Sequence, residues 1–299
     1  MSIIERVAEL LGSVPQTHQK PSTASEGAGS LEQDLIERVA GDTSRRRVFF
    51  EDKPARSTGS ASRTVMVDRD RLRRQSIITP DGERTAVAEN FRRIKRHILA
   101  NAASPRAGAP PANLVLVTSA VAGEGKTFCA INLAISIALE MDRTALLVDA
   151  DVAKPNVPQA LGLEAEKGLM EVLLDRRVDL AEVLWKTDIG TLTLLPSGTT
   201  HKHATELLAS DAMRALLQEM AERYHDRIII FDSPPLLAAS EAGVLASQMG
   251  QIVLVVEAAK TSEAALKDAL ARIDASRVAG LLLNKGEDLS LKYGYAGYG

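Results

Sequence analysis

The sequence is poor in cysteine, in aromatic residues and in long apolar runs. Its 299 residues include one cysteine and one tryptophan, and only 3% are aromatic. A single cysteine excludes an intramolecular disulfide and fits a reducing compartment. No apolar run approaches the roughly 18 residues of a membrane-spanning helix, and the N-terminus lacks a signal-peptide pattern, so we expect neither a transmembrane helix nor secretion. The net charge of −3 and the 45% hydrophobic content are ordinary for a soluble protein.

Most of the few tyrosines lie at the C-terminus. The last seven residues read Tyr293-Gly-Tyr-Ala-Gly-Tyr-Gly299 and contain Tyr293, Tyr295 and Tyr298, three of the four tyrosines in the chain. Glycine loosens the backbone and chain ends are usually poorly ordered, so the pattern predicts tyrosine hydroxyls on a flexible tether. An enzyme that modifies tyrosine needs such a substrate; the alternative is a low-complexity, adhesive tail.

A phosphate-binding loop is predicted between residues 114 and 127. The segment reads Leu-Val-Leu-Val-Thr-Ser-Ala-Val-Ala-Gly-Glu-Gly-Lys-Thr, an apolar strand that enters a glycine-containing turn, and helical spacing continues from Phe128. Glycines let backbone N–H groups converge on phosphate at a helix N-terminus. Lys126 is placed to reach the β- and γ-phosphates, and Thr127 to bind Mg²⁺. Ala120 replaces the first glycine of the usual motif.

Aspartates follow two further buried-type strands. Asp149 and Asp151 come after the strand predicted near 145–149, and Asp232 ends the strand predicted near 227–231. Ligands of parallel sheets bind beyond the carboxyl ends of the strands, where these acids and the phosphate loop are expected to meet. A single aspartate there is often only a helix cap. Three of them beside a phosphate loop indicate the Mg²⁺ and nucleophile machinery of a nucleoside triphosphatase.

The remaining pattern predicts an α/β fold of the P-loop NTPase class, with a mostly parallel sheet covered by helices on both faces. Other strands are expected near 191–195, 251–256 and 279–284, and helices at 84–100, 204–223 and 261–275. We divide the chain into a basic, partly disordered extension with short amphipathic helices (1–75), a catalytic domain (76–290) and a flexible tyrosine-rich tail (291–299). The extension's arginine clusters favour an anionic membrane surface or an acidic partner, or else belong to a solvated arm.

Together these motifs resemble the cytoplasmic domain of the bacterial tyrosine kinases over roughly residues 65–299. The match comprises the Walker A stretch, the Asp149-x-Asp151 motif, the Walker B aspartate Asp232 and the tyrosine tail. A weaker fifth element is Glu89-x-x-Arg92-x-x-Lys95, which resembles the family's ring-packing motif. The sequence is most similar to the stand-alone autokinases encoded with exosortase-linked exopolysaccharide systems.

The resemblance implies an autokinase that uses ATP and Mg²⁺ and phosphorylates its own tail in trans. It implies catalytic roles for Lys126, Asp149, Asp151 and Asp232, with Asp149 as the base, and Mg²⁺ binding by Thr127, Asp151 and Asp232. The acceptors are Tyr293, Tyr295 and Tyr298, and the oligomer interface comprises Glu89, Arg92 and Lys95. The residues expected to bind the cofactor are Ala122, Gly123, Glu124, Gly125, Lys126, Thr127, Phe128 and Asn284. For Asn284, capping of the sheet edge is an equally open role.

The implied partners are other copies in a ring-like homo-oligomer and a separate membrane-anchored chain-length-determinant or activator protein. That partner would hold the cytoplasmic chain at the inner membrane, and no nucleic acid is implied. Three residues depart from the family pattern: Ala122 replaces a frequent proline, Ala153 a frequent arginine and Lys95 an arginine.

Two rival functions remain at this stage. A positioning ATPase of the Min or Par type shares the fold, but usually carries a second lysine where this chain has Val121. Its membrane-bound members end in a basic amphipathic helix, which the tyrosine tail does not resemble. The other rival is a non-catalytic, nucleotide-switched scaffold of polysaccharide export.

Overall fold

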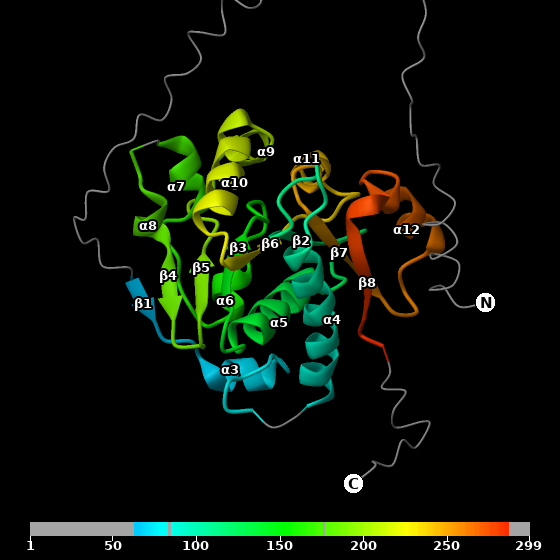
Figure 1. Ribbon diagram of the computed structural model, residues 1–299, viewed down its shortest axis with the longest axis horizontal. Coiled ribbons are helices and arrows are strands. Elements are labelled where there is room, and N and C mark those ends of the chain that lie inside the picture. The colour runs from blue at the N-terminus through cyan, green and yellow to red at the C-terminus, as the bar shows by residue number, and fades with distance from the viewer. Residues whose placement is uncertain (1–62, 83–84, 176, 287–299) are drawn as a thin grey trace, which may run out of the picture. The chain divides into compact units, whose positions relative to one another are not determined.

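One eight-stranded sheet organises the part of the chain that the structure describes, residues 63–82, 85–175 and 177–286 of a computed structural model (Figure 1). The strand order is β1-β4-β5-β3-β6-β2-β7-β8. Every neighbouring pair is parallel except β4 and β5, which are antiparallel. The strands are β1 Arg63–Val65, β2 Leu114–Ser119, β3 Thr144–Asp149, β4 Trp185–Thr187, β5 Leu192–Leu195, β6 Arg227–Asp232, β7 Gln251–Glu257 and β8 Val278–Asn284.

The central strands are buried on both faces, which is why they read as continuous apolar runs rather than as alternating patterns. Successive residues of β2 show this: Val115 and Val117 belong to one hydrophobic cluster, and Leu114 and Leu116 to another on the opposite face. All six residues of β2 are buried. The predicted mostly parallel sheet with helices on both faces is confirmed.

Helices cover each face. One face carries α4 (Ala86–Ala103) and α5 (Lys126–Ala138), which contribute buried residues such as Ile98 and Ile131. The other face carries α10 (Asp211–Arg223) and several short helices around it (Figure 1). The remaining helices are α3 Arg69–Arg74, α6 Val157–Ala160, α7 Leu169–Leu174, α8 Leu180–Val183, α9 Ala204–Leu208, α11 Ser240–Ala246 and α12 Glu263–Leu270. Among the described residues, none of the helices has the length and apolar composition needed to cross a membrane.

The expected helix at 204–223 is interrupted. The chain forms α9 and α10 instead, because Ser210 adopts an extended conformation and its hydroxyl accepts a hydrogen bond from the N–H of Met213 at 3.2 Å. Such a serine N-cap starts a new helix and ends the preceding run. The helix expected at 261–275 likewise starts behind an N-cap, Ser262, and ends at Leu270.

Residues 63–75, which we expected in the extension, are part of the folded domain. β1 pairs with β4, and the side chain of Leu72 in α3 is fully buried in the core. Two arginines that suggested an anionic partner are paired within the chain instead: Arg69 with Asp188 at 3.1 Å and Arg73 with Asp70 at 2.7 Å. Three apolar residues, Val65, Val67 and Leu72, are buried in the core and attach this arginine-rich segment to the domain. The other 62 residues of the expected extension and the tyrosine tail lie outside the described residues.

We predict that Leu72→Ala lowers the free energy of unfolding by about 3 kcal/mol, since removal of a fully buried leucine side chain typically costs 2–5 kcal/mol. Urea denaturation followed by circular dichroism measures the loss. Met66→Ala is the matched control, because Met66 lies in the same segment with 73% of its surface exposed. If both variants unfold at the wild-type urea concentration, residues 63–75 do not belong to the fold.

Candidate active site

The loop between β2 and α5 has the backbone of a phosphate-binding loop. Gly123 and Gly125 have φ angles of 91° and 92°, a left-handed region that glycine enters without a steric cost. Lys126 starts α5 immediately after Gly125, so the free N–H groups of the first helical turn face the loop. The replacement of the first motif glycine is harmless, because Ala120 is fully buried and is not among the positive-φ residues.

The three predicted aspartates do lie beside this loop. Asp149 and Asp232 are paired in register at the ends of the parallel strands β3 and β6. The Thr127 hydroxyl donates to Asp232 Oδ2 at 2.6 Å, and Lys126 Nζ lies 2.6 Å from Asp151 Oδ2. All three carboxylates are buried. The structure therefore brings together the residues to which the sequence assigned catalysis and Mg²⁺ binding.

Burial and mutual repulsion shift the pKa values of these groups. Desolvation, with repulsion from Asp232, raises the pKa of Asp149 to about 7. Desolvation also raises the pKa of Asp232 to about 6, although Lys126 and the Thr127 hydroxyl oppose the rise. Burial alone would lower the pKa of Lys126, but the charges of Asp232 and Asp151 outweigh it and the pKa is raised. At neutral pH the site thus holds a firmly charged lysine and a carboxyl group poised to exchange a proton.

The residues fit a magnesium ion. Asp232 Oδ1 and Asp149 Oδ1 are buried without a hydrogen-bond partner, and a buried carboxylate oxygen is costly unless a cation or a proton binds it; Asp232 Oδ1 fits the cation, and Asp149 Oδ1 is open to a proton. Mg²⁺ prefers such oxygens, and usually binds one or two carboxylates together with substrate phosphates and water.

The contacts that orient the Asp149 side chain were not predicted from the sequence. Its Oδ2 accepts hydrogen bonds from the backbone N–H groups of Asn156 and Val157, both at 3.0 Å, at the start of α6. The free Oδ1 is thereby fixed in direction. The signal available in the sequence was Pro158, a residue favoured in a first helical turn, as here in α6 after Asn156.

Three predicted cofactor residues have side chains engaged within the protein. Asn284 Nδ2 donates to the backbone oxygen of Glu124 at 2.8 Å, which fastens the end of β8 to the loop. Phe128 packs edge-on against Phe91 of α4, with 6.3 Å between ring centroids. The carboxylate of Glu124 is buried and faces the turn after β7. Only backbone groups of Glu124 and Phe128 are then placed to contact phosphate.

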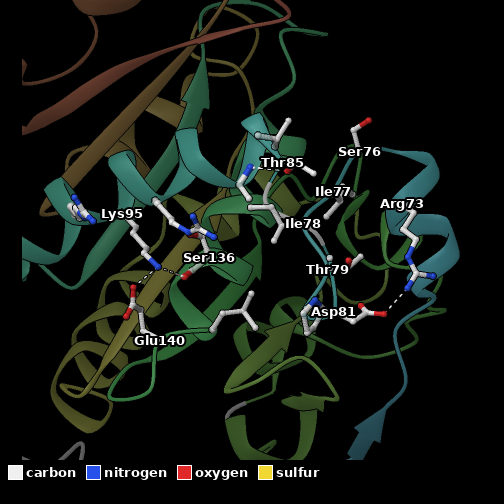
Figure 2. Close-up of a pocket in the computed structure, with 17 residues that line it drawn as sticks. Arg73, Ser76, Ile77, Ile78, Thr79, Asp81, Thr85, Lys95, Ser136 and Glu140 are labelled. Atoms are coloured by element: carbon white, nitrogen blue, oxygen red, sulfur yellow. Dashed lines mark hydrogen bonds and ion pairs between the residues drawn. The ribbon is translucent and has the colours of Figure 1, made fainter. Parts of the chain in front are cut away.

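The three residues predicted to form the oligomer interface, Glu89, Arg92 and Lys95, differ in their exposure to solvent. Glu89 and Arg92 are partly exposed and pair with each other at 2.7 Å. Lys95, predicted to join them, is buried: its Nζ donates to the Ser136 backbone oxygen at 3.0 Å and pairs with Glu140, as Figure 2 shows. Lys95 belongs to α4, but its ammonium group lies at the C-terminal end of α5. There it binds a free carbonyl oxygen and interacts favourably with the negative end of the helix dipole. Lys95 is therefore a structural residue, and its assignment to an exposed interface was wrong.

Lys95 also lines a cavity of about 790 Å³ between α4, the end of α5 and the segment before α4 (Figure 2). Ser136, another lining residue, lies ten residues along α5 from Lys126, or about 15 Å at 1.5 Å per residue. The cavity is thus separate from the phosphate loop. Cys129 behaves as its position in α5 suggested: it is buried, and desolvation raises the pKa of its thiol to about 12, which keeps it unreactive.

The site is that of a P-loop nucleoside triphosphatase. It combines a glycine-rich loop after β2, a lysine at the start of α5 and carboxylates at the ends of β3 and β6. A family model described as an AAA domain matches residues 113–279. The tyrosine-protein kinase YwqD of Bacillus subtilis (strain 168) is 37% identical over 188 residues, 61% of this chain and 77% of that protein.

Longer relatives match as well. The succinoglycan biosynthesis transport protein ExoP of Rhizobium meliloti (strain 1021) is 32% identical over 224 residues, which are 72% of this chain and only 27% of that protein. Among solved structures, the chimerical protein CapA2B2 has a TM-score of 0.62 at 26% identity, over 72% of this chain and 91% of that chain.

The chain belongs to the AAA-domain family and, within it, to the bacterial tyrosine-protein kinases. The predicted enzyme class, a protein-tyrosine kinase that uses ATP and Mg²⁺, is confirmed.

We predict that the nucleotide-free protein loses stability as the pH rises from about 4 to 7. Asp149 and Asp232 bind protons more tightly when folded, with pKa values of about 7 and 6 against 3.8 for an ordinary aspartate, so their contribution is complete below pH 4 and is lost as pH passes those values. Asp149→Asn should flatten the curve. Urea unfolding at pH 5 to 8 in EDTA measures this, with the exposed Asp268→Asn as control; parallel curves for all three proteins would contradict the assignment.

Proposed function

We propose that this chain is an autokinase that transfers the γ-phosphoryl group of ATP to Tyr293, Tyr295 and Tyr298. The observation that supports this most is the grouping of Lys126, Thr127 and three buried aspartates in one site of a chain that belongs to the tyrosine kinases. The acceptor tyrosines lie outside the described residues, and their assignment rests on the sequence of the tail. The described chain ends at Gly286, two residues after Asn284, whose side chain contacts the phosphate loop.

The residue roles follow from the contacts. Lys126 and the loop N–H groups would bind the phosphate oxygens and stabilise their charge, which is the main means of catalysing phosphoryl transfer. Asp151 already pairs with Lys126 and would keep it aimed at the phosphates. Thr127, Asp232 and Asp151 would hold Mg²⁺, directly or through water. When bound, that ion neutralises charge on the β- and γ-phosphates.

Asp149 is proposed as the base. A free phenol has a pKa near 10, so transfer at neutral pH gains from a nearby proton acceptor. The unpartnered Oδ1 of Asp149 would take the phenolic proton as the tyrosine oxygen forms its bond to the γ-phosphorus. The bond between that phosphorus and the bridging oxygen breaks at the same time, and ADP leaves with the bridging oxygen. The raised pKa of Asp149, about 7, suits a group that must both take and release a proton.

Transfer is proposed to occur in trans within a ring-like homo-oligomer. Glu89 and Arg92 lie one turn apart on α4. The Glu89 side chain is 50% exposed and the Arg92 side chain 38% exposed. A neighbouring copy that meets this surface would exchange the internal Glu89–Arg92 pair for pairs between subunits. A separate membrane-anchored activator would bring the assembly to the inner membrane, and no nucleic-acid partner is proposed.

The process served is proposed to be the synthesis or export of an exopolysaccharide. ExoP, the relative that aligns over 72% of this chain, is named a succinoglycan biosynthesis transport protein. This chain matches only 27% of ExoP, so most of that protein lies outside the match. The similarity to exosortase-linked autokinases narrows the proposal to that type of polysaccharide system.

We predict that incubation with Mg-ATP and an activating partner places phosphate on Tyr293, Tyr295 and Tyr298, and that Lys126→Met abolishes it by removing the phosphate-binding charge. Mass spectrometry of the purified protein locates the phosphate. Lys186→Met, which changes an exposed lysine of β4, should remain phosphorylated like wild type. A wild-type protein that hydrolyses ATP but carries no phosphotyrosine would instead support a positioning ATPase.

A further inference from the structure

A buried carboxylate holds the phosphate loop from behind. Glu124 has only 1% of its surface exposed. Its Oε2 accepts a hydrogen bond from the N–H of Val121 at 2.8 Å, which closes the loop on itself. Its Oε1 accepts from the Thr261 hydroxyl, in the turn between β7 and α12. The side chain that would be expected to face a nucleotide is therefore used to connect the loop to a neighbouring strand.

That connection continues into β7. Thr261 Oγ1 accepts from the N–H of Glu257 at 3.0 Å while it donates to Glu124. The hydroxyl thus relays a hydrogen bond from the last residue of β7 to the loop after β2, two strands that are neighbours in the sheet (Figure 1). Hydrogen bonds in such chains polarise one another, and those to a charged acceptor are stronger than neutral ones.

A second arm reaches the loop from β8. Lys285 Nζ donates to the Gly123 backbone oxygen at 2.7 Å and lies 3.2 Å from Glu257 Oε2, so both arms meet at Glu257. Lys285 has a φ angle of 57°, a left-handed conformation in which a lysine is less stable than a glycine. The backbone there would favour glycine, and the side-chain contacts with the loop are what a lysine adds.

We propose that Thr261 and Lys285 are positioning residues for the nucleotide, and that together with Glu124 and Glu257 they form a brace that fixes the shape of the phosphate loop. The loop needs one, because it contains two left-handed glycines and glycine loses the most conformational freedom when it is ordered. A loop that is already ordered binds phosphate with a smaller entropic cost. The proposal rests on the nucleotide site proposed above and adds residues that do not touch the nucleotide.

The test for Thr261 is the affinity for Mg-ADP, measured by calorimetry on the full chain. Thr261→Val keeps the shape and removes the hydroxyl, and we expect binding weaker by about tenfold or more from the loss of one hydrogen bond to a charged group. Ser262→Ala is the control: it removes the N-cap of α12 in the same turn, where Ser262 Oγ accepts from Ala265, without touching the loop. Its affinity should equal that of wild type.

A double variant shows whether Thr261 and Glu124 act through the same hydrogen bond or weaken binding independently. Adding Thr261→Val to Glu124→Leu, which removes both carboxylate oxygens, should weaken binding by much less than fivefold beyond Glu124→Leu alone, because the bond from Thr261 is then already lost. Losses that multiply would overturn the coupling, and so would an unchanged affinity for Thr261→Val. A wild type that binds no Mg-ADP would overturn the nucleotide site itself, whereas wild-type binding with unaffected variants would overturn the brace alone.

Lys285→Gly distinguishes positioning from stability. Glycine relieves the left-handed backbone, so the thermal midpoint without nucleotide should stay equal or rise, while the affinity for Mg-ADP falls about fivefold or more. Lys285→Arg keeps the charge and a donor and should recover part of that affinity. A residue that served only the fold would move stability and affinity together, and an unchanged affinity in Lys285→Gly would overturn its role.

Discussion

The structure depends on placing three buried carboxylates and one partly buried ammonium group together at the ends of β3 and β6. Desolvation raises the pKa values of Asp149 and Asp232, repulsion between carboxylates adds to the rise, and Lys126 opposes it only at Asp232; one oxygen of each aspartate lacks a hydrogen-bond partner. Such an arrangement is costly for a protein alone. The cost would fall if Mg²⁺ added positive charge next to the carboxylates, so these groups favour binding of the ion.

The sheet makes this concentration of charge possible. From β2 the chain crosses through α5 to β3 on one side, and from β6 it crosses over β2 to β7 on the other. The loop after β2 thus lies where the connections diverge, the position at which open α/β sheets bind ligands. The parallel register of β3 and β6 pairs Asp149 with Asp232, so the two carboxylates lie side by side at the ends of neighbouring strands.

Prediction from sequence worked where residue type dictates the structure. The apolar runs of β2, β3, β6 and β7 fit buried strands, and the glycines of the phosphate loop stand where the backbone is left-handed and few other residue types are tolerated. It failed where a few contacts outweigh composition: Val65, Val67 and Leu72 dock an arginine-rich segment, and Ser210 divides one expected helix into two. Lys95 was misassigned because helical spacing does not show that the end of α5 lies beneath it. The brace at Glu124 was not foreseen, since its partners Glu257 and Thr261 lie more than 130 residues away in the sequence. The tail and the residue roles stay predictions.

The most direct measurement is transfer between two defective copies. Full-length Lys126→Met retains the tail but lacks the catalytic lysine, and a chain ending at residue 290 retains the site but lacks the tail. Mixed with Mg-ATP and an activating partner, the first should acquire phosphate on Tyr293, Tyr295 and Tyr298, because the site of one copy acts on the tail of another. Absence of phosphotyrosine from the Lys126→Met chain, under conditions in which wild type phosphorylates itself, would contradict transfer in trans.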